Sequence, residues 1–443
     1  MELNSGAKTI IDKLNAHGHQ AYAVGGFVRN FFLNIPVLDV DITTSATPKE
    51  VIEIFKDYKV YLTGLKHGTV TINVMGENVE VTTFRVDGDY KDNRHPNSVA
   101  FVSNLEEDLK RRDFTVNAMA YDGNELIDIF GGQEDIKNRI IRAVGEPEKR
   151  FEEDALRILR ALRFASVLDF EIEEKTALAI DKCAHLLKSV SKERVFLELT
   201  KMLLGDGVER VLLKHKRAIF EVIGELQRCD GFEQNSKFHA YDVLVHTAKA
   251  VALSVKDRSV RWALLLHDIE KPSTYSVDEN GAGHFYGHQK KSADTAVKIL
   301  KSLKADNNLI NEVRFLILLH DHKTEISRGE IKKLLNVYGV SVIKKLVDVK
   351  IGDALSHAQP YAEERKLLTL KFSKTVNDII SNNECFTLKR LKIDGNDVKR
   401  AGFNGAEIKR VLTALLNDVM FDKVKNDRTE LINRLYNDER FRK

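Results

Sequence analysis

The chain has 443 residues, 43% of them hydrophobic and 30% charged, which is typical of a globular protein with about three domains. Its 69 Lys and Arg residues nearly balance its 66 Asp and Glu residues, so the net charge of +3 excludes a histone-like polycation. Three widely spaced cysteines exclude a disulfide scaffold and favour the cytoplasm, and neither a membrane-spanning run nor a secretory signal is expected.

Short apolar runs alternate with helical segments in the first third of the chain. Helices are predicted over residues 7–14 and 47–55, the second of them with Thr47 as cap and Pro48 in its first turn. Strands are predicted over residues 21–24, 38–42, 60–62, 69–74, 78–84 and 99–101. Residues 1–142 are therefore expected to form an α/β head.

From about residue 148 onward the pattern is that of long amphipathic helices, and no strand pattern of comparable length returns. Such helices are predicted for FEEDALRILRALRFAS, EEKTALAIDKCAHLLKSV and SKERVFLELTKMLLG. The polar stretch 227–237 is interpreted as a linker. The predicted class is α+β, with a mixed-sheet head at 1–142, a helical neck at 143–226, a histidine-containing helical domain at 238–360 and a helical tail at 361–443.

A glycine turn follows the first predicted strand. Gly25 and Gly26 allow a tight turn with close backbone approach to a ligand, and the helix start behind them, with Arg29, attracts anions. Gly-Gly turns are common, so this segment alone favours a purely structural role.

An acidic pair comes thirteen residues after Gly26. Asp39 and Asp41 stand two apart in a predicted strand, so both carboxylates are expected on one face. Such a pair can hold the Mg²⁺ ions of nucleotidyl transfer, although a solvated strand face is the alternative. The preceding glycine turn favours the metal site, and Glu80 is a candidate third carboxylate on a neighbouring strand.

Arginines supply the remaining candidates for nucleotide contacts. Arg111 and Arg112 are placed to clamp triphosphate oxygens, or equally to form a basic surface. Asp154 and Arg157 are three apart on a predicted helix, where an ordinary salt bridge is the alternative. A carboxylate accepts and a guanidinium donates hydrogen bonds, so together they match the amine and ring nitrogen of cytosine or adenine, whereas uracil and guanine present the reverse.

Eight segments occur in an order that identifies a family resemblance. These are VGGFVRN, LDVDITTSATP, GLKHGTV, EVTTFR, RRDFTVNAMAYD, FGGQEDI, EDALRILRALRFA and KERVFLEL. Over about residues 7–205 the chain resembles class II tRNA nucleotidyltransferases, the CCA-adding enzymes, and the related bacterial poly(A) polymerases. The resemblance implies a polymerase-β-like head that uses Mg²⁺, CTP, ATP and tRNA.

The resemblance also implies roles for particular residues. The catalytic, metal-binding carboxylates are Asp39 and Asp41, and the residues implied to bind the incoming nucleotide are Gly25, Gly26, Arg29, Arg111, Arg112, Asp154, Arg157, Arg160 and Arg163. Glu193, Arg194 and Glu198 resemble the helix motif that supports the neck and positions tRNA, with Arg194 as an RNA contact. Residues 87–101 match the flexible loop used in the switch from C to A addition. Asn30 replaces the usual Asp and is expected to support the turn.

Histidines and aspartates in the third region form a second constellation. They resemble the signature of HD phosphohydrolase domains, and the implied ligands of a divalent metal are His246, His267, Asp268, His288, His320 and Asp353. Glu270 stands where the signature commonly has Gly, so perturbed hydrolysis is expected. The alternative is an all-helical domain that extends the tRNA-binding body.

The leading interpretation is an enzyme that adds CCA to tRNA 3′ ends from CTP and ATP. A poly(A) polymerase, or a partial enzyme adding only A or only CC, remains open, as does an HD phosphohydrolase acting on nucleotides or RNA ends. A non-catalytic RNA-binding module conflicts with the presence of both the acidic pair and the Asp154–Arg157 pair. No membrane and no obligate protein partner are indicated.

Overall fold

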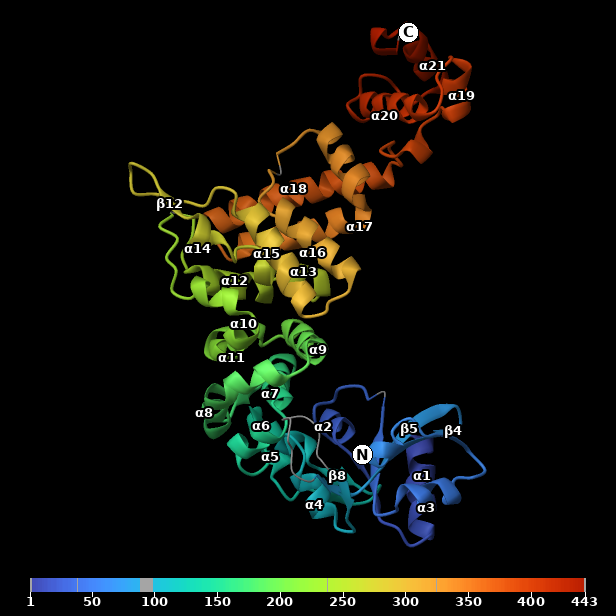
Figure 1. Ribbon diagram of the computed structural model, residues 1–443, viewed down its shortest axis with the longest axis vertical. Coiled ribbons are helices and arrows are strands. Elements are labelled where there is room, and N and C mark those ends of the chain that lie inside the picture. Colours follow the sequence, from blue (N-terminus) through green and yellow to red (C-terminus); the bar gives the residue numbers. More distant parts are fainter. Residues whose placement is uncertain (1, 38, 88–98, 237, 324, 442–443) are drawn as a thin grey trace. The chain divides into compact units, whose positions relative to one another are not determined.

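The computed structural model describes residues 2–37, 39–87, 99–236, 238–323 and 325–441. They form two compact units, Met1–Gly224 and Glu225–Lys443 (Figure 1). Most of the predicted loop at 87–101, and Leu38, lie outside the described residues. Among the helices of the described part, none has the length and apolar character needed to cross a bilayer.

A seven-stranded mixed sheet forms the centre of the head, in the order β3-β4-β5-β2-β1-β8-β9. Its strands are β1 (Ala21–Val24), β2 (Asp41–Thr44), β3 (Lys59–Tyr61), β4 (Thr69–Val74), β5 (Glu77–Thr83), β8 (Ala120–Tyr121) and β9 (Leu126–Ile127). β2 and β5 are parallel, and the other neighbours are antiparallel. The predicted combination of a mixed-sheet head with a largely helical remainder is confirmed.

The predicted strand at 38–42 is displaced in the structure. β2 begins at Asp41 and continues to Thr44, so Asp39 precedes the strand instead of lying within it. The threonines are fully buried, and Thr43 Oγ1 donates to Asp108 Oδ2 at 3.1 Å while Thr44 Oγ1 donates to Gln20 O at 2.7 Å. β-Branched side chains with satisfied hydroxyls suit a central strand better than the preceding loop does.

Helices and two small sheets complete the head. They are α1 (Ser5–Ala16), α2 (Gly26–Phe32), α3 (Pro48–Ile54), α4 (Leu105–Lys110), α5 (Gly132–Asn138), and the paired strands β6 (Arg85–Asp87) and β7 (Val99–Phe101). β10 (Ile140–Ile141), at the end of the head, pairs with β11 (Glu171–Ile172) of the helical segment that follows. The predicted start of α3 is confirmed, because Thr47 forms a capping box with Glu50. Such caps stabilise a helix by about 1 kcal/mol.

The predicted long helix around Asp154 is wrong in one respect, because the structure breaks it in two. The helices of this part are α6 (Pro147–Glu153), α7 (Leu156–Val167), α8 (Glu174–Cys183), α9 (Lys192–Leu203), α10 (Val208–Lys214) and α11 (Lys216–Val222). Asp154 has φ −137° and ψ 101°, and its Oδ1 accepts the Leu156 amide at 3.0 Å. A local hydrogen bond from the Leu156 amide to the Asp154 side chain, with extended backbone at Asp154, explains the break between α6 and α7.

The second unit is almost entirely helical. It contains α12 (Val243–Ala252), α13 (Arg258–Leu266), α14 (Lys271–Thr274), α15 (His288–Ser302), α16 (Asn307–Leu319), α17 (Arg328–Leu355), α18 (Tyr361–Ser381), α19 (Gly395–Arg400), α20 (Ala406–Met420) and α21 (Arg428–Asn437), with a hairpin of β12 (Ser276–Val277) and β13 (Gly283–His284). Part of the predicted linker packs into this unit. Gln234 is 2% exposed and accepts a hydrogen bond from Lys271 Nζ at 2.9 Å, so the linker prediction is wrong there.

Candidate active site

An open cavity of about 420 Å³ in the first unit is lined by all nine predicted nucleotide-binding residues. It is lined by Gly25, Gly26, Arg29, Asp41, Arg111, Arg112, Asp113, Asn117, Asp154, Arg157, Arg160, Arg163 and Phe164. Asp41 and the pair Asp154 and Arg157 therefore share one cleft. Six arginines face three aspartates among these residues, which gives the cleft an excess of positive charge suited to a triphosphate.

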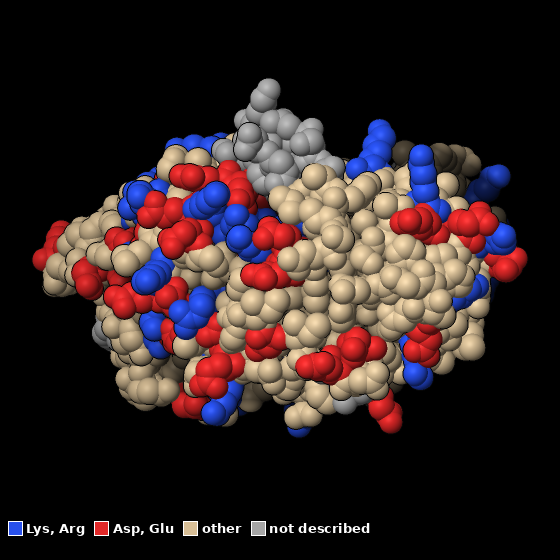
Figure 2. All heavy atoms as spheres, turned by 90° about the horizontal axis from the view of Figure 1, so that it is seen from below, with Lys and Arg blue, Asp and Glu red and all other residues tan. Residues whose placement is uncertain are grey.

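One outer face of the molecule does not show the same excess. Figure 2 shows the molecule from below the view of Figure 1, and on this face acidic and basic side chains lie interspersed. This mixture agrees with the overall net charge of +3. The cleft, rather than that face, is where guanidinium groups concentrate in the first unit.

The acidic pair lies at the start of β2. Asp41 is the register partner of Val24 on β1 and of Glu80 on β5, so Glu80 stands beside it on the neighbouring strand. The surrounding protein desolvates the carboxyl of Asp41 and raises its pKa; Arg112 opposes this change and Asp39 adds to it. A divalent cation would relieve the repulsion between the two carboxylates, and their oxygens are the hard ligands that Mg²⁺ prefers.

The glycine turn brings an arginine to the cleft. Gly25 has φ +68°, and a Cβ there would lie 3.4 Å from Arg112 Nη1, so glycine suits both the backbone and the close approach. Arg29 donates to Asn30 Oδ1 from Nε at 3.1 Å and from Nη2 at 2.8 Å, and its Nη1 donates to Asn117 Oδ1 at 2.6 Å. Asn30, the departure from the family pattern, thus orients Arg29.

Asp108, which the sequence reasoning missed, fixes the arginine pair. Arg111 donates to Asp108 Oδ1 at 3.0 and 2.7 Å, and Arg112 Nη2 donates to Oδ2 at 3.2 Å. Burial would raise the pKa of Asp108, but the two guanidinium groups outweigh it and hold that pKa below its ordinary value. A sequence pattern could have revealed this contact, because Asp108 stands three residues before Arg111 and four before Arg112, at the end of a helix.

Three further guanidinium groups surround one aromatic ring. Arg29, Arg160 and Arg163 lie 5.1, 5.4 and 4.1 Å from the centroid of Phe164. Burial and the nearby Arg163 lower the pKa of Arg29 to about 10, so it remains charged at neutral pH. Cation–π attraction to the face of the Phe164 ring offsets part of the repulsion between these guanidinium groups. Phe164 was not singled out in the sequence.

Acidic partners hold two of these arginines in place. Arg160 Nε donates to Asp113 Oδ2 at 2.7 Å; burial would raise the pKa of Asp113, but Arg160 helps to lower it to about 2. Arg163 Nε lies 3.2 Å from Glu198 Oε2, and Glu198 is itself buried. Glu198 therefore supports the cleft from α9, whereas Glu193 on the same helix is exposed.

Asp154 and Arg157 each pair with a different residue. The alternative considered from the sequence, a salt bridge between the two, is therefore replaced by a bridge from Asp154 to Arg194 and one from Arg157 to Glu153. Arg194 Nη2 donates to Asp154 Oδ2 at 3.1 Å. Arg157, 8% exposed, donates to Glu153 Oε2 at 2.7 Å and to the Arg111 carbonyl at 3.0 Å. Both side chains are held in fixed positions at the cleft. Arg194, expected as an RNA contact, lies against Asp154.

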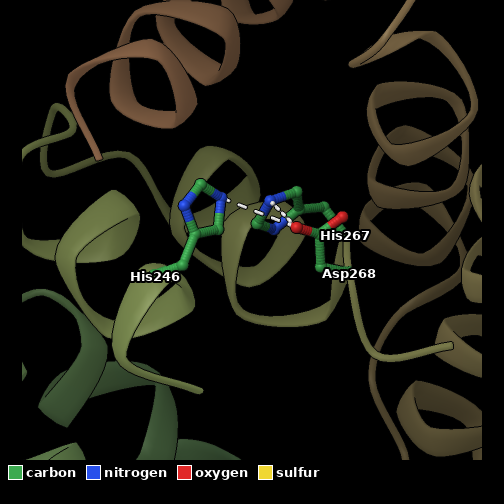
Figure 3. Close-up of side chains that lie close together, drawn as sticks. All are labelled: His246, His267 and Asp268. Carbon is green, nitrogen blue, oxygen red and sulfur yellow. Dashed lines mark ion pairs between the residues drawn. The ribbon is translucent and has the colours of Figure 1, made fainter. Parts of the chain in front are cut away.

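A second cluster lies in the other unit and contains all six predicted metal residues. His246, His267 and Asp268 come from α12 and the end of α13 (Figure 3). His246 Nε2 is 3.0 Å from Asp353 Oδ1, while Asp268 is approached by His267 Nε2 at 3.1 Å, His288 Nε2 at 3.3 Å and His320 Nε2 at 3.8 Å. All six residues are at most 6% exposed.

The hydrogen bonds of the histidines suit a metal. Nδ1 donates to a backbone carbonyl in His267 (2.7 Å), His288 (2.7 Å) and His320 (2.6 Å), so Nε2 is the ring nitrogen left to face Asp268. Burial opposes ionisation of His267, yet Asp268 and Asp353 raise its pKa to about 10, so a divalent cation would bind Nε2 of this ring by displacing its proton. Within the described residues, neither carboxylate oxygen of Asp268 has a hydrogen-bond partner. Lys271 Nζ forms an ion pair with Asp268 Oδ2 at 2.7 Å. These donors fit a divalent cation.

Glu270 does not enter this cluster. Its carboxylate accepts hydrogen bonds from Thr295 Oγ1 of α15 at 2.8 Å, from Arg228 Nη2 at 3.2 Å and from Ser273 Oγ of α14. We expect Glu270→Gly to change the affinity for Mn²⁺ less than twofold in calorimetry. The same change should lower the free energy of unfolding by about 1–3 kcal/mol, because buried hydrogen-bond partners are lost.

The control for this prediction is Glu279→Gly, at an exposed position of the β12–β13 hairpin. It should alter neither metal affinity nor stability by a comparable amount. A tenfold or larger change in Mn²⁺ affinity on Glu270→Gly would contradict the separation of Glu270 from the metal residues.

The mixed sheet, acidic pair and arginine-lined cleft are the features expected of a nucleotidyltransferase, and three family descriptions match the chain. The Poly A polymerase head domain matches residues 21–142, the probable RNA and SrmB-binding site of polymerase A matches 169–215, and the HD domain matches 239–358. A solved structure, the Bacillus stearothermophilus CCA-adding enzyme in complex with CTP, is 31% identical with a TM-score of 0.72, covering 98% of this chain and 97% of that one. The chain therefore belongs to the class II CCA-adding enzyme family.

Curated relatives match about half of the chain. The CCA-adding enzyme of Enterococcus faecalis is 54% identical over 200 residues, 45% of this chain and 49% of that protein. The CCA-adding enzyme of Lactobacillus helveticus is 50% identical over 222 residues, 50% of this chain and 53% of that protein. The matched stretch thus spans about half the length of these relatives. A Thermotoga maritima CCA-adding enzyme complexed with tRNA, 22% identical with a TM-score of 0.56, shares the fold.

Proposed function

We propose that this protein adds CCA to the 3′ ends of tRNA from CTP and ATP, by Mg²⁺-dependent nucleotidyl transfer without a template. The observation that carries the proposal is the cleft that Asp41 shares with Asp154 and Arg157. It places a candidate metal carboxylate, triphosphate-binding guanidinium groups and a candidate base-reading pair around one volume. The names of the relatives above support the same activity.

Base selection is assigned to Asp154 and Arg157. Asp154 accepts from the exocyclic amine of cytosine or adenine, and Arg157 donates to the adjacent ring nitrogen. Uracil and guanine would place an acceptor against the carboxylate and a donor against the guanidinium. Because Arg194 and Glu153 hold the two side chains, little reorganisation is needed when the base arrives.

Asp39 and Asp41 would hold Mg²⁺, which when bound lowers the pKa of the attacking hydroxyl and stabilises the departing pyrophosphate. The 3′-hydroxyl of the RNA attacks the α-phosphate in line, forming the new P–O bond as the bond to pyrophosphate breaks. Arg29, Arg111 and Arg112 bind the triphosphate oxygens and neutralise their charge. Asn30 and Asp108 fix the guanidinium groups before the substrate binds, so positioning supplies much of the rate.

The experiment that tests this function uses tRNA transcripts ending at the discriminator base. CTP alone should add two residues, CTP with ATP should complete the end, and UTP and GTP should fail. Long A tracts formed without CTP would establish a poly(A) polymerase. Products that stop after CC with both nucleotides present, or addition of A only to a CC end, would establish a partial enzyme.

A second function is favoured by the buried His–Asp cluster. We infer that the six residues bind a divalent metal ion and that this unit hydrolyses phosphoesters of nucleotides or RNA ends. In His267→Ala the full chain should bind one Mn²⁺ ion fewer than wild type in calorimetry, while the site assigned to Asp39 and Asp41 is retained. Phosphate release from a 2′,3′-cyclic RNA end followed by phosphatase should be lost with that ion. Metal binding without any hydrolysis would leave a structural metal site and overturn the hydrolase function.

Location and RNA contacts follow from the same proposal. The free cysteines are buried, and a reducing cytoplasm suits them and a tRNA substrate.

We assign tRNA binding to the neck, residues 143–226, and to the tail, residues 361–443, through the phosphate backbone and the shape of the RNA more than through its sequence.

A further inference from the structure

We propose that Asn30 and Asn117 determine how tightly the cleft binds a triphosphate, because they hold Arg29 in place without neutralising its charge. This assignment rests on the proposed nucleotidyltransferase function, for which it names two residues that set substrate affinity. The role given to Asn30 is thus one of charge as well as of position: its side chain is a neutral acceptor at a place where a carboxylate would compete with the substrate for Arg29.

Arg29 differs from the other five arginines of the cleft in the side chains that hold it. Each of those five pairs with a carboxylate: Arg111 and Arg112 with Asp108, Arg157 with Glu153, Arg160 with Asp113, and Arg163 with Glu198. Within the described residues, both side-chain acceptors of Arg29 are amide oxygens, those of Asn30 and Asn117. An amide oxygen accepts a hydrogen bond without adding a negative charge, so Arg29 keeps its full charge for a ligand.

Asn117 stands between Arg29 and an acidic group. Its Oδ1 accepts from Arg29 Nη1 at 2.6 Å, and its Nδ2 donates to Asp113 Oδ1 at 3.1 Å. Since a guanidinium only donates and a carboxylate only accepts, these two contacts fix the orientation of the amide. The other oxygen of Asp113 accepts from Arg160 Nε at 2.7 Å. Asp113 is therefore paired with Arg160 and does not contact Arg29 directly.

Two neighbouring guanidinium groups repel Arg29. Arg160 and Arg163 lie over the same Phe164 ring as Arg29 does. Burial and then the charge of Arg163 lower the pKa of Arg29, with a smaller contribution from Arg160, whereas Asp113 opposes the change. A bound polyanion would relieve this repulsion, and an arginine already paired with a carboxylate gains less from the same ligand. Arg29 is therefore the arginine of the cleft that gains most from a triphosphate.

Two substitutions at Asn30 separate its charge from its hydrogen bonds. Arg29 donates to Asn30 Oδ1 from Nε at 3.1 Å and from Nη2 at 2.8 Å. Asn30→Asp keeps this acceptor and the size of the side chain, adds one negative charge, and restores the residue usual in the family. Asn30→Ala removes the acceptor and adds no charge. If Asn30 acted by orientation alone, the aspartate variant would bind a triphosphate as well as wild type does and better than the alanine variant.

The test measures binding of CTP and CMP to the full chain by calorimetry, without divalent metal, so that no cation offsets the added charge. Asn30→Asp should weaken CTP binding about tenfold, the effect expected of one unit charge several ångströms from a polyanion. Its effect on CMP should be smaller, about threefold or less, because CMP carries fewer negative charges. Asn30→Ala should weaken CTP only about threefold, through the loss of preorganisation.

The matched control is Asn15→Asp, at an exposed position of α1 in the same unit, and it should change neither affinity. CTP binding by Asn30→Asp as tight as or tighter than that by Asn30→Ala, or an equal loss for CTP and CMP, would overturn the role assigned to the charge at residue 30. If wild type adds nucleotides to tRNA in that case, the nucleotidyltransferase function stands and only this role fails. If the expected order of affinities is found in a protein that adds no nucleotide, the role stands and the proposed function fails.

Discussion

Asp41→Asn should reduce nucleotide incorporation into tRNA by about a thousandfold. The carboxylate opens β2 inside the cleft, beside Asp39 and Glu80, and its loss removes a ligand from the site assigned to Mg²⁺. Metal stabilisation of the transition state amounts to several kcal/mol, and each 1.36 kcal/mol corresponds to a factor of ten in rate. Single-turnover incorporation of labelled CTP measures this loss directly.

The matched control is Asp12→Asn. Asp12 lies on α1 in an exposed ion pair with Lys8, and such pairs contribute little to stability or activity. It should retain the wild-type rate. CTP binding by Asp41→Asn should weaken far less than its rate falls, because the arginines of the cleft remain in place. A residual rate within tenfold of wild type would contradict the role assigned to Asp41.

Asp154→Ala should lose base discrimination more than overall fold or metal binding. Charge-assisted hydrogen bonds contribute about 1.5–3 kcal/mol, so the preference for CTP over UTP should fall by roughly ten- to a hundredfold. Arg194→Ala should produce a smaller loss in the same direction, because Arg194 only holds the Asp154 carboxylate. The measurement is the ratio of kcat/KM for CTP and UTP on a transcript ending at the discriminator base.

Glu152→Ala provides the control, since Glu152 is an exposed neighbour on α6. Its discrimination should equal that of wild type. Equal loss of CTP and UTP incorporation in Asp154→Ala, with the ratio unchanged, would assign Asp154 to the local break between α6 and α7 alone.

The sequence predicted the parts of the fold that local patterns determine. Strands β1 and β4 and the start of α3 were located closely, because apolar alternation and a Thr-Pro cap act within a few residues. The break between α6 and α7 was missed. Asp154 fits a helical pattern by spacing, but its side chain accepts a hydrogen bond from the Leu156 amide and pairs with Arg194 from α9, forty residues further on.

The cleft could be predicted as a set of residues but not as a set of contacts. Asp108 and Phe164 are assigned no contact with the substrate; they fix arginines of the cleft. The contact of Asp108 with Arg111 is local and left a sequence pattern, whereas the contact of Phe164 with Arg29 of α2 depends on tertiary packing and left none. In the second unit, the order of histidines and aspartates predicted the cluster, whereas Arg365 and Lys271 become visible as neighbours only once α14 and α18 are placed.

The most direct measurement is a crystal structure of the full chain with CTP and Mg²⁺. We expect the cytosine amine to face Asp154, its ring nitrogen to face Arg157, and the triphosphate to lie among Arg29, Arg111 and Arg112 with the cation between Asp39 and Asp41. A nucleotide bound elsewhere, or bound here with its ring edge turned away from Asp154 and Arg157, would contradict the proposed mechanism.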